Sequence, residues 1–223
     1  MYLLFAPAIL GAYLLGSIPF GVLIARAYGK DLRAIGSGNI GATNVARALG
    51  KKWAYICFAL DVLKGMIPML VTMPLATSEP AQGNEFVLHL LWLVVGCAAI
   101  IGHIFPIYLK FKGGKGVSTS FGVALGLWPY YTICAVIAIA VWIVVVLIWR
   151  YVSLASIAAS VTFPLALILA IVIKPGWEFA ALWPLVIAAT VIPLMVIILH
   201  RENIKRLLAG KESKIREAKN KQN

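Results

Sequence analysis

Three glycines and four small polar residues are interleaved over residues 36–44, which read Gly-Ser-Gly-Asn-Ile-Gly-Ala-Thr-Asn. Glycine lets the backbone approach a ligand closely, and successive N–H groups form a concave site for an anion. The run lacks the Gly-Lys-Ser/Thr ending of a Walker loop. It predicts a loop that holds a phosphate or an acyl carbonyl, although a flexible polar linker would have a similar composition. The candidate ligand-binding residues are Gly36, Ser37, Gly38, Asn39, Gly41, Thr43, Asn44 and, one helical turn further on, Arg47.

Two further polar stretches carry groups that suit an anionic substrate. Residues 113–116 read Gly-Gly-Lys-Gly and precede an apolar segment. Glycine N–H groups at a helix start, with a lysine among them, favour an anion; a tight basic turn would read the same way. His200 and Asn203 are three residues apart, so they share one helix face. Ser153 follows a short turn at Arg150.

Long apolar segments must position these stretches. Of 223 residues, 62% are hydrophobic and 13% are charged, and the mean hydropathy is +0.94. A soluble protein averages about 45–50% apolar and about 25% charged residues, and a membrane-spanning helix needs about 20 apolar residues. We therefore predict an all-α polytopic membrane protein with one domain over residues 1–223 and a basic tail from about residue 200, which starts as a helix and frays. The expected spans are 2–25, 53–73, 86–108, 117–128, 130–149, 152–173 and 179–199.

The charge distribution predicts the topology. Counting the short segment 117–128 as a span gives seven transmembrane helices, with the N-terminus outside and the C-terminus in the cytoplasm. All basic residues except Lys64 and Lys174 then fall on the cytoplasmic side, as the positive-inside rule requires. The net charge of +12 therefore reflects membrane topology, and we expect no nucleic-acid partner. Within the second span, Asp61 and Lys64 can pair on one helix face, either as a structural pair or beside a cavity.

The polar stretches would meet at one membrane face. Carboxylates are scarce on that face, whereas a divalent cation prefers several oxygen ligands, so we expect no metal site. The three cysteines stand singly in apolar runs, which favours neither a disulfide framework nor a zinc site. Such a face suits substrates that are rich in phosphate and carry a lipid tail.

The polar motifs resemble those of one enzyme family in order and spacing. They are the run at 36–44, Gly-His-Ile-Phe-Pro at 102–106 with Phe-Lys-Gly-Gly-Lys-Gly-Val at 111–117, and His-Arg-Glu-Asn-Ile at 200–204. Together they closely resemble the three motifs of the bacterial acyl-phosphate:glycerol-3-phosphate acyltransferases, the PlsY family. The family more often has Ala at the position of Ser118.

This resemblance implies transfer of a fatty acyl group from acyl phosphate to the first hydroxyl of glycerol 3-phosphate, giving lysophosphatidic acid and phosphate. Because an acyl phosphate is already activated, we expect no cofactor. It also implies a multi-pass protein of the bacterial inner membrane, with its active site facing the cytoplasm; we expect a monomer. By position, we expect catalytic roles for Ser37, Arg47, Lys115 and His200. We expect substrate binding by Gly36, Gly38, Asn39, Gly41, Thr43, Asn44, Gly113, Gly114, Gly116, Ser153 and Asn203.

Three alternatives stay open at this point. The general base is either His200 or the departing phosphate, and we favour a role for His200 in positioning glycerol 3-phosphate. Ser37 could form an acyl-enzyme, although its motif contains no residue to activate it. A transporter of an organic phosphate or phospholipid precursor is the alternative function, but transporter sites usually lie at the bilayer midplane between repeats.

Overall fold

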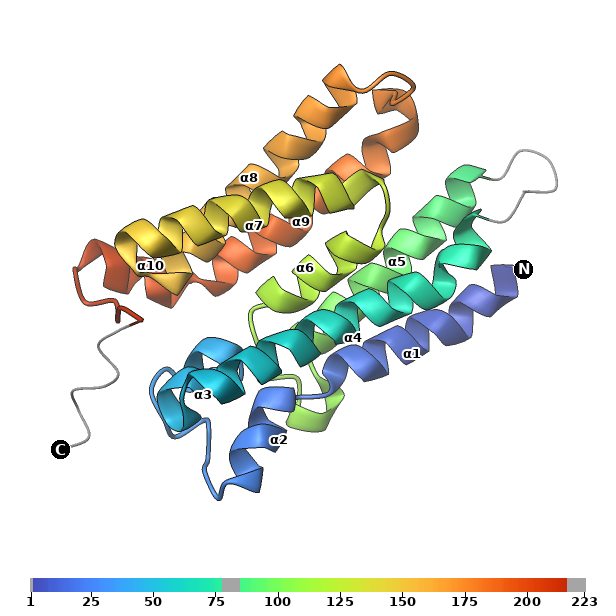
Figure 1. Cartoon of the computed structure of the whole chain (residues 1–223). Helices are drawn as coiled ribbons and strands as arrows, with labels where there is room; N and C mark the ends of the chain where they lie inside the picture. Colours follow the sequence, from blue (N-terminus) through green and yellow to red (C-terminus); the bar gives the residue numbers. More distant parts are fainter. Residues whose placement is uncertain (1, 78–84, 216–223) are drawn as a thin grey trace. The chain divides into compact units, whose positions relative to one another are not determined.

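The computed structural model describes residues 2–77 and 85–215, and all regular secondary structure within these ranges is helical (Figure 1). The chain divides into two compact units, Met1–Trp128 and Pro129–Asn223. The helices of the first unit are η1 (Tyr2–Leu4), α1 (Phe5–Ser17), α2 (Phe20–Ala27), α3 (Ala42–Leu49), α4 (Lys51–Thr77), α5 (Glu85–Ile104), η2 (Ile107–Leu109) and α6 (Val117–Gly126). Those of the second are α7 (Tyr130–Trp149), α8 (Val152–Ile173), α9 (Phe179–Leu199) and α10 (Arg201–Leu208).

The predicted membrane-spanning helices are confirmed. In the described part of the chain, six helical stretches are long and apolar enough to cross a membrane, and α6 is a shorter apolar helix. Their bounds follow the apolar segments closely because the charged and turn-forming residues lie between them. The crossing of the membrane by α6 and the sides on which the termini lie stay predictions.

The first span differs from the expected uninterrupted helix over residues 2–25. It consists of α1 and α2, which are separated by Ile18 and Pro19. Proline lacks a backbone N–H and clashes with the preceding helical turn, so a helix ends before it. The carbonyl of Ile18 instead accepts a hydrogen bond from Lys64 Nζ of α4 at 2.9 Å. A side chain of another helix therefore satisfies the carbonyl at the break.

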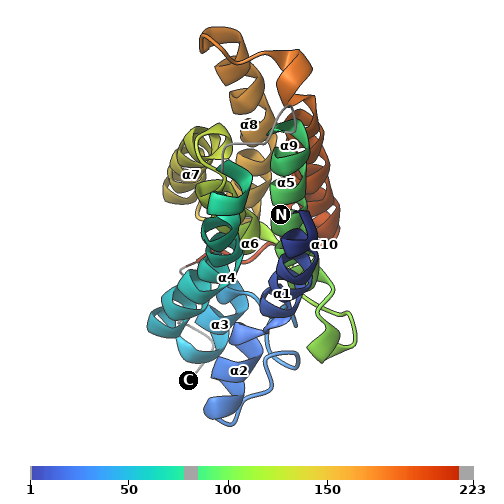
Figure 2. The same cartoon turned by 90° about the vertical axis from the view of Figure 1, so that its right-hand side faces the viewer.

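Close helix packing organises the first unit. α1 packs on α5, α4 packs on α5 and α6, and α3 packs on α4 (Figure 1 and Figure 2). Gly65 of α4 and Gly122 of α6 lie where these two helices cross. A Cβ at Gly65 would meet the Thr119 carbonyl, and one at Gly122 would meet the Val62 carbonyl. This approach fixes α6, and with it the loop before it, against α4.

The second unit packs α7 on α8 and α8 on α9, and α10 contacts α8 and α9. Large apolar side chains such as Leu147 and Val172 are exposed on it, as expected where lipid covers the helices. The basic tail begins as a helix, because residues 201–208 form α10. Side-chain contacts made by the following residues hold this helix; residues 216–223 of the predicted tail lie outside the described part of the chain.

Candidate active site

A packed loop, rather than a flexible linker, carries the first polar motif. It runs from the end of α2 to the start of α3. Leu32 in this loop is 1% exposed and packs in an apolar cluster with Ala25 and Val45. The buried side chain of Asn44 donates from Nδ2 to the carbonyls of Leu32 and Ile35, at 2.9 and 3.0 Å. Its Oδ1 accepts from the Ser37 N–H at 3.2 Å.

The turn within this loop requires glycine. Gly36 has φ 56°, in the left-handed region that favours glycine. A Cβ there would lie 2.5 Å from Asn44 Oδ1 and 3.0 Å from Arg47 Cδ. Asn39 closes the adjoining turn, because its Oδ1 accepts from the Gly41 N–H at 2.9 Å. Ser37 is exposed and Arg47 is half-buried, while Asn44 lies behind the loop.

The second glycine motif packs against the end of α5. The Gly113 N–H donates to the Ile104 carbonyl, and the Gly114 N–H donates to the His103 carbonyl, each at 3.0 Å. A Cβ at Gly114 would overlap the His103 ring. These two N–H groups are therefore engaged within the protein, contrary to the expectation that they face an anion. Gly113 and Gly114 shape the loop, and Lys115 follows them, half-buried, before α6.

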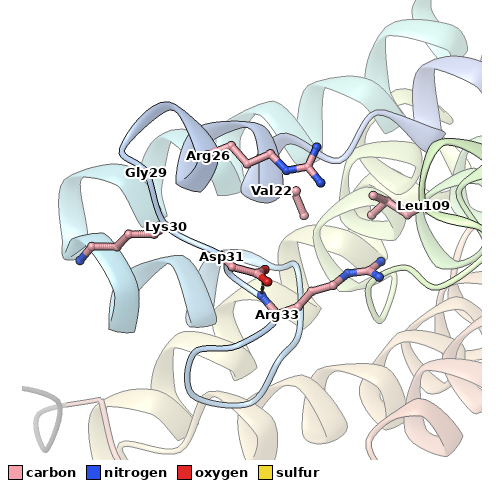
Figure 3. A pocket seen from close by; sticks show the side chains of 7 residues that line it. All are labelled: Val22, Arg26, Gly29, Lys30, Asp31, Arg33 and Leu109. Atoms are coloured by element: carbon pink, nitrogen blue, oxygen red, sulfur yellow. Dashed lines mark hydrogen bonds between the residues drawn. The ribbon is translucent and has the colours of Figure 1, made fainter.

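The two motif loops are joined at the same end of the first unit. Arg33 Nη2, from the loop before α3, donates to the Lys112 carbonyl at 2.8 Å. Beside this bond is an open cleft of about 420 Å³. Figure 3 shows that Arg26 and Arg33 extend toward the side of Leu109, whereas Lys30 points away. Three of the seven lining residues are basic; the lining comprises Val22, Arg26, Gly29, Lys30, Asp31, Arg33 and Leu109.

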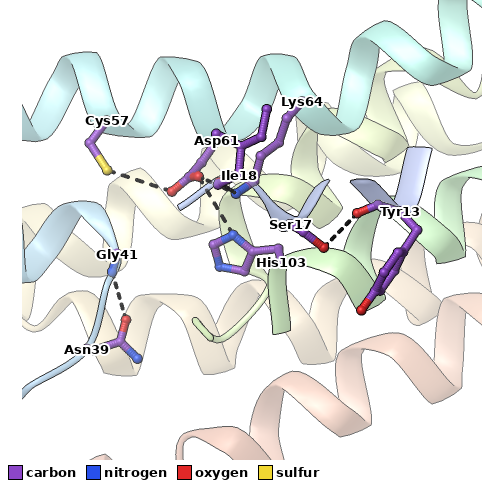
Figure 4. A network of polar contacts seen from close by, with 9 residues as sticks. All are labelled: Tyr13, Ser17, Ile18, Asn39, Gly41, Cys57, Asp61, Lys64 and His103. Atoms are coloured by element: carbon purple, nitrogen blue, oxygen red, sulfur yellow. Dashed lines mark hydrogen bonds and ion pairs between the residues drawn. The ribbon is translucent and has the colours of Figure 1, made fainter. Parts of the chain in front are cut away.

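A buried charged network lies behind the second loop (Figure 4). Lys64 Nζ is 2.7 Å from Asp61 Oδ1, and both side chains are at most 3% exposed. This confirms the pairing predicted from their spacing. His103 Nδ1 lies 3.7 Å from the same oxygen, which is longer than a hydrogen bond. Because Lys64 also holds the Ile18 carbonyl, the network links α4 to α5 and to the break between α1 and α2.

In the second unit, His200 caps the end of α9. It is 3% exposed, and its Nδ1 lies 2.7 Å from the Val196 carbonyl oxygen. A carbonyl only accepts hydrogen bonds, so this contact assigns the proton to Nδ1 and leaves Nε2 as an acceptor in the neutral ring. Such a ring can accept a hydrogen bond or a proton from a hydroxyl group.

Ser153 and Asn203 meet at a carboxylate. Glu212, from the chain that follows α10, accepts from Ser153 Oγ at 2.8 Å and from Asn203 Nδ2 at 2.6 Å. Arg206 Nε donates to the other Glu212 oxygen at 2.7 Å. Burial acts to raise the pKa of Glu212. The three hydrogen bonds and the charge of Arg206 outweigh that effect and hold the pKa below its ordinary value.

Comparison with known proteins identifies the family. A profile of the family described as glycerol-3-phosphate acyltransferase matches residues 6–210. The chain belongs to this family. Glycerol-3-phosphate acyltransferases of Trichlorobacter lovleyi and Aquifex aeolicus are 45% and 44% identical to it; the matches cover 93% and 90% of this chain and 96% and 94% of theirs.

Solved structures of the family resemble the fold. A crystal structure of PlsY (YgiH), described as an integral membrane glycerol 3-phosphate acyltransferase in its glycerol 3-phosphate form, aligns with a TM-score of 0.78 at 42% identity. A structure of PlsY (YgiH) in its lysophosphatidic acid form aligns with a TM-score of 0.75 at 41% identity. Each alignment covers 94% of both chains.

Within this glycerol-3-phosphate acyltransferase family member, the expected site residues fall into two sets. The first unit joins the loops that contain Ser37 and Lys115, through the Arg33–Lys112 bond. The second unit brings Ser153 and Asn203 together, with His200 at the adjoining helix end. Among residues 2–77 and 85–215, no group of three or more His, Cys, Asp or Glu side chains could hold a metal ion.

Three residues that support the site were missed by the sequence analysis: Arg33, His103 and Glu212. Arg33 resembled an ordinary basic residue near a membrane surface, and His103 entered only as part of a family motif. Glu212 had one available signal, the Ala-Gly pair at 209–210, because glycine commonly ends a helix and reverses the chain. Gly210 does adopt φ 65°.

Proposed function

We propose that this chain transfers a fatty acyl group from acyl phosphate to the sn-1 hydroxyl of glycerol 3-phosphate, releasing lysophosphatidic acid and phosphate. Its family membership supports acyl transfer, and relatives named for glycerol 3-phosphate support the acceptor. The observation that carries the proposal is the bond between Arg33 and the Lys112 carbonyl. It joins two glycine-rich loops: the first leads into α3, which carries Arg47, and the second contains Lys115. Both cations suit phosphate groups.

An acyl phosphate is a mixed anhydride, so its carbonyl is reactive without a cofactor. In the proposed reaction the acceptor oxygen attacks the carbonyl carbon, a C–O ester bond forms, and the carbon–oxygen bond to phosphate breaks. The electron pair leaves with the phosphate, and the hydroxyl proton ends on it. Holding both substrates in register can supply about 7–11 kcal/mol of the barrier.

The basic residues offset the electrostatic cost of this arrangement. Two phosphate groups repel one another, and charge grows on the departing phosphate as the bond breaks. Arg47 and Lys115 would stabilise that charge, because fixed cations act most strongly where charge develops in the transition state. We assign Ser37, Thr43 and the backbone of the first loop to substrate contact, and Asn44, Gly113 and Gly114 to shaping the two loops.

The proton acceptor has two candidates within this proposal. His200 Nε2 is an acceptor in the assigned tautomer, and the departing phosphate can itself take the hydroxyl proton. We propose that His200 mainly positions glycerol 3-phosphate by accepting a hydrogen bond from it. An acyl-enzyme on Ser37 is disfavoured, since the motif at 36–44 contains no His or Asp to activate its hydroxyl.

The remaining proposals concern the setting of the reaction. We propose that the whole chain works as one membrane domain of the bacterial inner membrane. Its motif loops would face the cytoplasm, with the basic tail from about residue 200 on the same side. We expect a monomer that takes acyl phosphate from the bilayer and glycerol 3-phosphate from water.

A two-donor assay tests the function. Purified protein in detergent micelles is given palmitoyl phosphate or palmitoyl coenzyme A, each with and without glycerol 3-phosphate. We expect lysophosphatidic acid and equimolar phosphate only from palmitoyl phosphate with glycerol 3-phosphate. Arg47→Ala should abolish the product, whereas Arg201→Ala, which changes an exposed arginine outside the proposed site, should not. Lysophosphatidic acid formed from the thioester would refute the donor; movement of glycerol 3-phosphate into proteoliposomes without acylation would favour a transporter.

A further inference from the structure

The carboxylate of Glu212 is the hub of the polar cluster in the second unit. It is 8% exposed, although it comes from a stretch of chain outside the helices. One oxygen accepts from both Ser153 and Asn203, and the other accepts from Arg206. Two of these three donors, Ser153 and Asn203, are expected substrate-binding residues.

The chain after α10 is folded so as to deliver Glu212. It turns at Gly210, and the Lys211 N–H donates to the Arg206 carbonyl at 2.7 Å. Beyond Glu212, the Ile215 N–H donates to the Arg150 carbonyl at 3.1 Å, which attaches this segment to the turn between α7 and α8. Lys214 Nζ also lies 5.5 Å from the centre of the Tyr151 ring. These contacts on both sides of Glu212 fix the position of its side chain.

The direction of these hydrogen bonds limits what Ser153 can bind. A carboxylate only accepts, so the Ser153 hydroxyl proton is committed to Glu212, and its oxygen can offer only lone pairs to anything else. Phosphate oxygens need donors, whereas an alcohol can donate. Asn203 likewise spends one N–H on Glu212. A substrate group that meets Ser153 must therefore supply the hydrogen, which the hydroxyl groups of glycerol 3-phosphate can do.

We propose that Glu212 is a positioning residue that orients Ser153 and Asn203 to bind the hydroxyl end of the acceptor rather than a phosphate group. This inference rests on the proposed function. It assigns Glu212 no contact with substrate, because its effect passes through the two side chains that it holds. A purely structural role, in which Glu212 only fastens the chain after α10 to α8, is the competing explanation.

Kinetics of Glu212→Gln separate these roles. The amide keeps the shape of the side chain but replaces one acceptor oxygen with an NH2 donor. With its remaining oxygen held by the charged Arg206, that NH2 group faces Ser153 and Asn203, which then lose their acceptor. We expect KM for glycerol 3-phosphate to rise about tenfold or more, as for a lost hydrogen bond to a charged group, with KM for palmitoyl phosphate unchanged. Glu212→Asp should recover part of the loss, since it keeps an acceptor-only group. Glu202→Gln is the matched control, because Glu202 is exposed and pairs with Lys205 on α10.

Each outcome decides the inference. Unchanged KM for glycerol 3-phosphate in Glu212→Gln, or a lowered melting temperature with both KM values unchanged, would overturn the positioning role. An equal rise in both KM values would overturn it too. The wild-type protein is assayed first, so an absence of glycerol 3-phosphate-dependent phosphate release there counts against the proposed function and not against Glu212 alone.

Discussion

At the scale of single residues, a variant of His200 tests whether this side chain positions glycerol 3-phosphate or accepts its proton. Its Nδ1 faces the Val196 carbonyl, so only Nε2 can receive a substrate hydroxyl. His200→Gln keeps a hydrogen-bond acceptor but removes the proton acceptor. If His200 positions glycerol 3-phosphate, its KM should rise while kcat falls by less than about 100-fold. Steady-state kinetics with varied glycerol 3-phosphate measure both. A fall in kcat of about four orders of magnitude at unchanged KM would make His200 the general base.

The stability of the protein should respond differently to the same chemical change at two asparagines of the first motif. Asn44→Asp removes the Nδ2 donor from the Leu32 and Ile35 carbonyls, at about 1–3 kcal/mol for each buried group left unpaired. Asn39→Asp keeps the oxygen that accepts from Gly41. We expect Asn44→Asp to lower the melting temperature and the activity, and Asn39→Asp to leave the melting temperature nearly unchanged. Thermal unfolding in detergent measures this, and equal effects would contradict the assigned contacts.

Residue types were easier to predict than residue roles. The sequence indicated an anion-binding loop because Gly36, Gly38 and Arg47 suit that chemistry. It could not show that Asn44 lies behind the loop, since its partners at 32, 35 and 37 depend on the path of the backbone. The same limit concealed the engagement of the Gly113 and Gly114 N–H groups.

At the scale of helices, the lengths of the apolar runs in the sequence were enough to predict most of the membrane-spanning helices. The bounds of α7, α8 and α9 match the expected spans because each apolar run ends at a charged or turn-forming residue. The break at Pro19 was missed, although proline disfavours a continuing helix. Proline is tolerated inside α4 at positions 68 and 74, so its presence alone did not indicate a break. At the break beside Pro19, Lys64 of α4 donates a hydrogen bond to the Ile18 carbonyl and so stabilises the interrupted helix.

The Asp61–Lys64 pair should stabilise the packing of the first unit. Lys64→Met leaves the Asp61 carboxylate buried without its cation and removes the donor from the Ile18 carbonyl. Breaking a buried pair costs about 3–5 kcal/mol, so the melting temperature should fall sharply. The double variant Asp61→Leu, Lys64→Met should regain part of that stability, because apolar residues of similar size often replace a buried pair at little cost. Additive losses in this cycle would show that the two residues act independently.

For the whole molecule, the topology predicts which surfaces share a compartment. Ser37 and Lys112, in the two loops that Arg33 joins, should lie on the cytoplasmic side, and Lys174 should lie outside. Single cysteines at these exposed positions can be labelled with a membrane-impermeant thiol reagent in oriented membranes. We expect Lys174→Cys to react in intact cells, and Ser37→Cys and Lys112→Cys to react only after the cytoplasmic side is opened. Labelling of Lys112→Cys and Lys174→Cys from the same side would contradict seven spans.

The path of one oxygen atom tests the proposed chemistry most directly. Palmitoyl phosphate is prepared with ¹⁸O in the oxygen that bridges carbonyl carbon and phosphorus, and is turned over with glycerol 3-phosphate. Attack on the carbonyl carbon predicts that all of the label leaves with inorganic phosphate and that the lysophosphatidic acid is unlabelled, as mass spectrometry of both products would show. Label retained in free palmitate, with phosphate moved to the acceptor, would contradict acyl transfer.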